Sequence, residues 1–152
     1  MTGFNHGMTG AIIALTIKQP ALAIPIAFAS HFIQDAVPHH DYFNEGGTKI
    51  LRGKFNYLLA ADFIFAVFLM VILGTWFPAH KWLIWGCMIA GALPDVMWSY
   101  YFFYIRDIKH RKIVFGPIAR FHQKMEWLEI GWGAYVELAW FILAGIILVN
   151  LR

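Results

Sequence analysis

Histidine and carboxylate side chains recur in this chain at the four-residue spacing that places them on one face of a helix. His31 and Asp35 form one such pair, and His122 and Glu126 form a second. Side chains at i and i+4 emerge one turn apart, so both members of a pair can reach the same point. Imidazole and carboxylate suit zinc, iron and manganese. The two pairs therefore predict a divalent-metal site.

Other polar residues can complete one or two coordination shells around these pairs. They lie near the chain start, after the second apolar stretch and within a later apolar stretch. The full predicted ligand set is His6, His31, Asp35, His39, Asp95, His122 and Glu126. Zinc is the first choice, manganese and iron are alternatives, and the donors are numerous enough for one or two ions.

The chemistry expected of such a site is metal-assisted hydrolysis. A bound ion lowers the pKa of its water and polarises a phosphoryl or carbonyl oxygen. Asp35, Asp62 and Glu126 are the predicted catalytic carboxylates, with Asp62 or Glu126 as general base. An alternative role for Asp62 is to cap or brace the helices. Ser-His-Asp catalysis is a weaker interpretation, because Ser30 and His31 are adjacent and point differently on a helix.

The composition predicts that these residues lie in a membrane protein. Of the 152 residues, 60% are hydrophobic and 14% are charged, whereas about 25% charged residues are usual in soluble domains. The mean hydropathy is +0.59. Nine acidic and twelve basic residues cannot cover a water-facing globule built from so much apolar surface. The net charge of +3 is therefore assigned to loops, and no nucleic-acid partner is expected.

The elements that must position the ligands are predicted to be about five helices in a single integral-membrane domain, residues 1–152. Three segments are long and apolar enough to be spans: Tyr57–Phe77, Trp82–Ile105 and Leu128–Leu151. Before them, Lys18-Gln19-Pro20 interrupts an uncharged stretch. A lysine in mid-membrane is costly, so we predict a hairpin of two helices, Phe4–Ile17 and Pro20–Val37. One long kinked span is the alternative.

The last predicted span carries a polar face. His122, Glu126, Glu129, Gly133 and Glu137 fall within one narrow arc at about 100° per residue. We therefore expect His122 and Glu126 to begin the same helix that carries Glu137. Glu129 has headgroup contact as an alternative role, and Glu137 has pairing with another helix.

The loop charges orient this bundle. The positive-inside rule places the two loops richest in Lys and Arg in the cytoplasm, so the N-terminus is cytoplasmic and the C-terminus is outside. The expected location is a prokaryotic-type inner or plasma membrane, with membrane lipids as partners. The predicted binders of a lipid phosphate are Arg52, Arg106, Arg111 and Arg120.

Three short motifs of this chain resemble the membrane-bound metal-dependent hydrolases. They are Asn5-His6-Gly7-Met8-Thr9-Gly10, Ser30-His31-Phe32-Ile33-Gln34-Asp35 and Ala92-Leu93-Pro94-Asp95. That family carries an early His, a Ser-His-xxx-Asp helix and a Leu-Pro-Asp segment in small multi-helix membrane domains. More distantly, the His122-xxx-Glu126 pair is similar to the ligand spacing of zinc-dependent phospholipase C. Val96-Met97-Trp98 stand where the family often has a second Asp and a His. The resemblance implies a divalent-metal hydrolase of phosphoesters.

The predicted function is a membrane-embedded, divalent-metal-dependent hydrolase that acts on a phosphoester of a lipid or lipid-like substrate near the cytoplasmic interface. The alternative is a non-catalytic membrane module, either an accessory subunit or a protein that binds lipid, haem or quinone. Bis-histidine haem ligation would use His31 and His122. A third possibility is a proton or ion pathway through Asp95 and Glu137.

Overall fold

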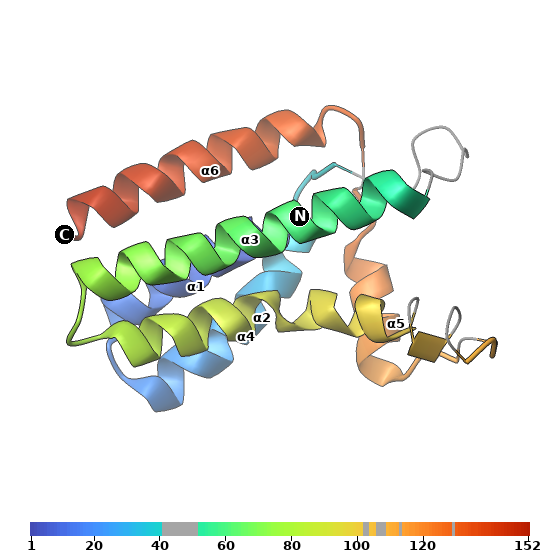
Figure 1. The fold of residues 1–152 in the computed structure, drawn as a ribbon, viewed down its shortest axis with the longest axis horizontal. Coiled ribbons are helices and arrows are strands. Elements are labelled where there is room, and N and C mark those ends of the chain that lie inside the picture. Colours follow the sequence, from blue (N-terminus) through green and yellow to red (C-terminus); the bar gives the residue numbers. More distant parts are fainter. Residues whose placement is uncertain (41–51, 102–103, 106–108, 113, 129) are drawn as a thin grey trace.

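Helices dominate the computed structural model, which describes residues 1–40, 52–101, 104–105, 109–112, 114–128 and 130–152. The described residues form six α-helices and no β-strand (Figure 1). The helices are α1 (Gly3–Ile17), α2 (Pro20–Asp35), α3 (Arg52–Trp76), α4 (Lys81–Ser99), α5 (Pro117–Met125) and α6 (Gly133–Asn150). The prediction of an all-α fold is confirmed for this part of the chain.

The first two helices form the predicted hairpin, and one continuous kinked helix is excluded. The residue after α1, Lys18, has a left-handed backbone with φ 58°, and its N–H bonds to the carbonyl of Ala14 at 3.0 Å. This conformation ends a helix and reverses the chain. Pro20 then begins α2, at a position where its missing N–H removes no helical hydrogen bond.

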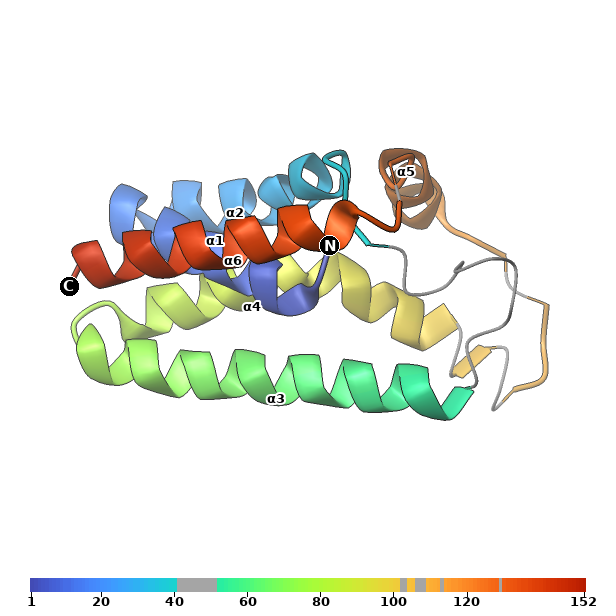
Figure 2. The same ribbon diagram turned by 90° about the horizontal axis from the view of Figure 1, so that it is seen from above.

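Helix α1 lies at the centre of the bundle, in contact with α2, α3, α4 and α6 (Figure 2). Asn5 and His6 are its buried polar residues, and the rest of its inward face is small or apolar, with Ala11, Ala14 and Leu15 buried. The core continues through Ala23 and Ala27 of α2. Small side chains let helix backbones approach closely, so α1 is surrounded on most of its length.

Two glycines bring α1 and α4 together. A Cβ at Gly10 would lie 2.2 Å from the carbonyl oxygen of Cys87, and a Cβ at Gly91 would lie 2.8 Å from that of His6. Only a residue without a side chain permits these backbone contacts. The Gly91 contact sets the position of His6 on α1 against α4, the helix that carries Asp95.

The prediction that His122 and Glu126 begin the helix that carries Glu137 is wrong. Helix α6 begins at Gly133, and His122 lies in the separate helix α5. Between them the chain pairs with the segment after α2: the His39 N–H bonds to the Leu128 carbonyl at 3.2 Å, and the Ile130 N–H bonds to the His39 carbonyl at 2.9 Å. A continuous polar arc from His122 to Glu137 is therefore excluded, and Glu129 lies outside the described residues.

The physical reason for this break is the close packing of Gly133 on His39. A Cβ at Gly133 would lie 2.1 Å from the backbone carbonyl carbon of His39. Glycine also weakens a helix by about 1 kcal/mol relative to alanine, and this segment contains Gly131 and Gly133. The α-helix within the predicted span Trp82–Ile105 ends at Ser99, and Tyr100, Tyr101, Tyr104 and Ile105 have a π-helical backbone.

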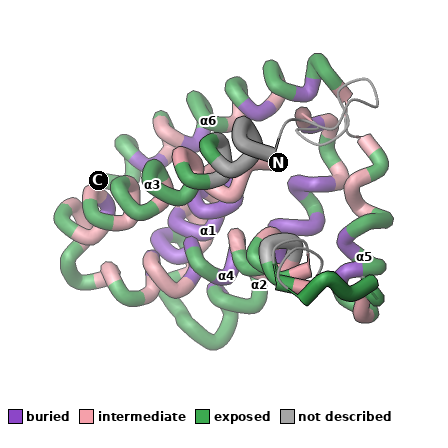
Figure 3. The backbone as a smooth tube through the Cα atoms, turned by 45° about the vertical axis from the view of Figure 1, so that its right-hand side comes forward, coloured by how far each residue is buried: buried purple, intermediate pink, exposed green. Residues whose placement is uncertain are grey.

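The outer surface of the bundle is strongly apolar. Helix α3 exposes Phe63, Phe65 and Phe68 by 69%, 61% and 62%, and exposed residues line the outer faces of the helices (Figure 3). By length and composition, one helix of the described chain, Gly133–Asn150, could cross a membrane, and Ala60–Trp76 is a shorter apolar stretch. The arrangement of about five spans stays a prediction.

Because α1 packs closely on α4, alanine substitution at two glycines of α1 should change the free energy of unfolding by different amounts. Gly10→Ala should lower the free energy of unfolding by about 1–3 kcal/mol, because its Cβ meets a backbone carbonyl that cannot turn away. Gly7→Ala is the matched control, since its Cβ would meet the flexible Met88 side chain at 3.5 Å. Thermal unfolding in detergent measures both. Equal stability of the two variants would contradict the packing described.

Candidate metal centre

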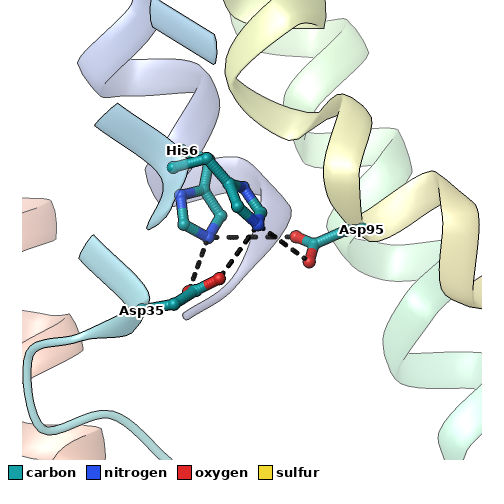
Figure 4. Close-up of side chains that lie close together, drawn as sticks. His6, Asp35 and Asp95 are labelled. Carbon is teal, nitrogen blue, oxygen red and sulfur yellow. Dashed lines mark ion pairs between the residues drawn. The ribbon is translucent and has the colours of Figure 1, made fainter. Parts of the chain in front are cut away.

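Four ionisable side chains from three helices converge at one point of the bundle. They are His6 of α1, His31 and Asp35 of α2, and Asp95 of α4, and one ligand atom from each lies within 4.8 Å of the others. Figure 4 shows His6, Asp35 and Asp95 turned toward one another. His6, His31 and Asp35 are buried, whereas the Asp95 side chain is 31% exposed. These four residues can hold a metal ion.

The Asp35 carboxylate lies at the centre of the group. Its Oδ1 is 3.1 Å from Nε2 of His6, and its Oδ2 is 2.9 Å from Nε2 of His31. The same Oδ2 is 2.7 Å from Nε2 of His122, which α5 contributes. Asp95 lies farther out, 3.6 Å from His31 Nε2 and 3.9 Å from His6 Nε2. One carboxylate thus connects ligands from three helices.

Helix α5 adds the second predicted pair to this centre. Nε2 of His122 lies 2.8 Å from Nε2 of His31, and Oε1 of Glu126 lies 3.7 Å from His122 Nε2. Ligand atoms of a tetrahedral zinc ion, at bond lengths of 2.0–2.1 Å, lie about 3.3 Å apart. The distances among the converging atoms fall on both sides of this value, so the donor set fits a small divalent cation.

The hydrogen bonds around the centre leave the converging nitrogens able to bind a metal. Nδ1 of His31 donates to the backbone carbonyl of Gly91 at 2.8 Å, and Nδ1 of His6 donates to Oε1 of Gln34 at 3.0 Å. A neutral imidazole that donates through Nδ1 keeps a lone pair on Nε2. Such outer hydrogen bonds orient metal-binding histidines.

One buried nitrogen of the centre lacks a hydrogen bond. Nε2 of His6 forms no bond of good geometry to any described residue, although Asp35 Oδ1 lies 3.1 Å away. Buried polar atoms are nearly always paired, and an exception requires an explanation such as an ion. A metal ion between His6 and the carboxylates would satisfy this atom.

The centre also favours positive charge. The Met1 ammonium lies 2.8 Å from Asp35 Oδ1. Burial by itself lowers the pKa of this amine, but the charges of Asp35, Asp95 and Glu137 outweigh burial and raise it. The carboxylates therefore stabilise a cation beside the imidazoles.

Two predicted site residues have structural partners instead. His39 is buried and outside the group of four, and its Nδ1 donates to the carbonyl of Val37 at 2.9 Å. Asp62 accepts a hydrogen bond from the backbone N–H of Phe4 at 3.0 Å. Its carboxylate therefore caps the first turn of α1 from α3, which is the alternative role considered for it.

The predicted phosphate-binding arginines are not brought to the centre as far as the structure describes them. Arg120 is exposed, its Nε donates to the carbonyl of Phe115 at 3.0 Å, and it lies about 200° around α5 from His122. Arg111 is exposed before α5. Arg106 and the side chain of Arg52 lie outside the described residues.

The structure gives Glu137 the alternative role considered for it, pairing with other elements, whereas sequence reasoning missed the role of Gln34. Glu137 of α6 is buried; its Oε2 accepts from the Thr2 N–H at 3.1 Å, and its Oε1 accepts from the His40 N–H at 3.0 Å. Glu137 thus ties α6 to the start of α1 and to the segment that follows α2. Gln34 orients His6, and the signal for it was its place beside Asp35 in the motif that begins at Ser30.

Comparisons with protein-family models, with curated proteins and with solved structures find no match. The resemblance to membrane-bound metal-dependent hydrolases thus rests on its three motifs. Each motif contributes to the converging group: the first supplies His6, the second supplies His31 and Asp35, and the third supplies Asp95.

Removal of one imidazole should strongly weaken metal binding. His31→Ala is expected to lower zinc affinity at least about 100-fold, beyond the 10–100-fold typical of outer-shell changes. The measurement is zinc content and competition with a chelator in purified protein. His80→Ala is the control, because His80 precedes α4 at its other end and its side chain makes no capping bond. Equal zinc affinity of the two variants would refute the assignment of His31.

Glu137 should be needed for stability and not for metal binding. Glu137→Gln replaces an acceptor oxygen with an NH₂ group that faces a backbone N–H, so we expect a loss of about 1–3 kcal/mol in the free energy of unfolding. Zinc content of the folded protein should stay the same. Loss of zinc without loss of stability would instead indicate that Glu137 is a metal ligand.

Proposed function

We propose that this chain is a polytopic membrane protein that hydrolyses a phosphoester of a lipid or lipid-like substrate with a divalent metal, zinc first. The observation that carries the proposal is the convergence of three imidazoles, those of His6, His31 and His122, on the Asp35 carboxylate. A second carboxylate, that of Asp95, lies within 4.0 Å of these imidazoles. These side chains come from α1, α2, α4 and α5. Such a mixed donor set is typical of catalytic zinc, manganese and iron sites.

The distribution of polar and apolar residues supports a membrane location. Large apolar side chains are exposed on α2, α3, α4 and α6, whereas His6, His31, Asp35 and Glu137 are buried. Soluble proteins show the reverse distribution. Ionisable residues within membranes face the interior of a bundle and mark functional sites. The bundle thus has the surface that lipid requires and an interior suited to metal binding.

The end of the bundle that carries the metal centre is proposed to face the cytoplasm. The start of α1, the end of α2 and helix α5 lie toward this end (Figure 1). Five exposed basic residues lie in α5 or in the segment before it: Lys109, Arg111, Lys112, Arg120 and Lys124. Basic residues are retained on the cytoplasmic side. The N-terminus is therefore cytoplasmic and the end of α6 lies on the opposite side.

The proposed reaction divides the carboxylates into different roles. A divalent ion at the centre would activate water and polarise the phosphoryl oxygen. His6, His31, His122, Asp35 and Asp95 would hold the ion, and Glu126, whose side chain is 23% exposed, would act as general base. The water oxygen bonds to phosphorus, Glu126 accepts its proton, and the ester P–O bond breaks. The released alkoxide takes up a proton to leave as the alcohol.

Haem ligation, one of the alternatives, fits the geometry less well. Nε2 of His31 and Nε2 of His122 lie 2.8 Å apart, and both contact Asp35 Oδ2. A porphyrin plane between the two histidines would displace this carboxylate. The geometry therefore favours a bare ion.

The proposed reaction is tested by release of headgroup or phosphate from a panel of phospholipids and a generic phosphoester. Asp35→Asn should lose both metal and activity. Glu126→Gln should keep metal and lose activity by about 100-fold or more, because it removes the general base alone. Chelated wild-type protein should be inactive and should recover when zinc is restored.

Equal release from wild-type, chelated and Asp35→Asn protein would show a contaminant. Absence of release from every substrate, despite stoichiometric zinc, would favour a non-catalytic module with a structural metal.

A further inference from the structure

The segment that leads into α5 and the helix itself are uniformly basic. Residues 109–125 contain five Lys and Arg residues and no Asp or Glu. All five, Lys109, Arg111, Lys112, Arg120 and Lys124, are exposed. Neither the metal centre nor the proposed reaction uses these side chains. Their charge therefore remains available to an anionic partner.

Helix α5 presents three different faces. Ala119 and His122 are buried against the bundle. Ile118 and Phe121 lie on the adjoining apolar face and are 52% and 50% exposed. The rings of Phe121 and Phe32 of α2 form a T-shaped pair with centroids 5.1 Å apart. Arg120 occupies the remaining, polar face. This combination of apolar and basic faces is typical of helices that lie in a membrane interface.

Residues beside α5 extend the apolar surface. Val114 is 76% exposed, Trp127 is 68% exposed and Trp132 is 55% exposed. Tryptophan is enriched where a protein meets the level of the lipid headgroups. The surface thus combines the two features that anionic membranes attract, which are apolar side chains and clustered positive charge.

We propose that α5 binds the surface of an anionic phospholipid membrane, and that this contact helps hold His122 in the metal centre. The inference rests on the proposed function, because it places the bundle in a membrane with α5 at its cytoplasmic face. Arg120 points away from His122, so the headgroups it binds belong to the surrounding membrane. A substrate phosphate at the metal would require other contacts.

The link between lipid and metal follows from the position of His122. Helix α5 packs on α2 and α4, and His122 is 2.7 Å from Asp35. A metal ion bound by His122 holds α5 against the bundle, and a lipid surface that holds α5 in place favours the same ligand. By thermodynamic reciprocity each must strengthen the binding of the other.

The position of α5 can be tested with fluorescent labels, because the single cysteine of the chain, Cys87, is buried. In a Cys87→Ala background, Ile118→Cys and Gln123→Cys are labelled separately in nanodiscs of phosphatidylcholine with or without phosphatidylglycerol. We expect a lipid-borne quencher to reach the label at 118 and aqueous iodide to reach the label at 123. Phosphatidylglycerol should increase the difference.

Charge removal provides the second arm of the experiment. Arg120→Gln combined with Lys124→Gln should abolish the effect of phosphatidylglycerol at position 118. Lys81→Gln, at the other end of α4, should not. Iodide access at 118 equal to that at 123 in both membranes would overturn the inference, whether or not zinc is bound.

The coupling between the lipid contact of α5 and metal binding is measured by zinc affinity. The wild-type protein should bind zinc about fivefold more tightly in the anionic nanodiscs than in neutral ones, which corresponds to the contribution of one basic residue. The double glutamine variant should show no such difference. Equal affinity in both membranes would overturn the coupling and leave the metal centre intact. Absence of zinc binding, with the label at 118 in lipid, would instead refute the proposed function.

Discussion

The buried carboxylate of Asp35 is the group on which the architecture depends. A charge removed from water is strongly destabilising unless other groups compensate it. Here the imidazoles of His6, His31 and His122 and the ammonium of Met1 surround the two oxygens at 2.7–3.1 Å. Removal of this carboxylate would leave the three imidazoles facing each other, with the Asp95 carboxylate 3.6–4.0 Å from them. Helices α1, α2 and α5 therefore meet at one point, and a divalent cation would satisfy the same donors more completely.

The surrounding carboxylates show that position and not residue type decides the role of an acid in this bundle. Asp62 accepts from the Phe4 N–H at the start of α1, and Glu137 accepts from the N–H groups of Thr2 and His40. Both fix the backbone beside His6 instead of entering the centre. A rigid frame of this kind is what an accurately spaced set of metal ligands requires.

The distribution of charge gives the bundle two different ends and one cluster of buried polar residues. The metal centre and helix α5 lie toward the basic end, whereas the outer faces of α3 and α6 expose large apolar side chains. The Asp95 and Glu126 side chains, 31% and 23% exposed, are the ligand-bearing groups nearest to solvent. Substrate would reach the centre from their side. This geometry fits the proposed substrate, which would keep its apolar part in lipid and present a polar group to a metal ion.

The sequence by itself determined the features that depend on neighbours along the chain. The hairpin at Lys18, the shared face of His31 and Asp35, and the nearness of His122 to Glu126 follow from local backbone preference and the 3.6-residue period. Tertiary structure decided which of these faces meet. Contacts such as Gly91 against His6 and Gly133 against His39 join residues far apart in sequence, and periodicity carries no information about them. For that reason the separation of α5 from α6 and the place of His39 outside the centre became visible only in the folded chain, and only the structure selected capping among the roles considered for Asp62.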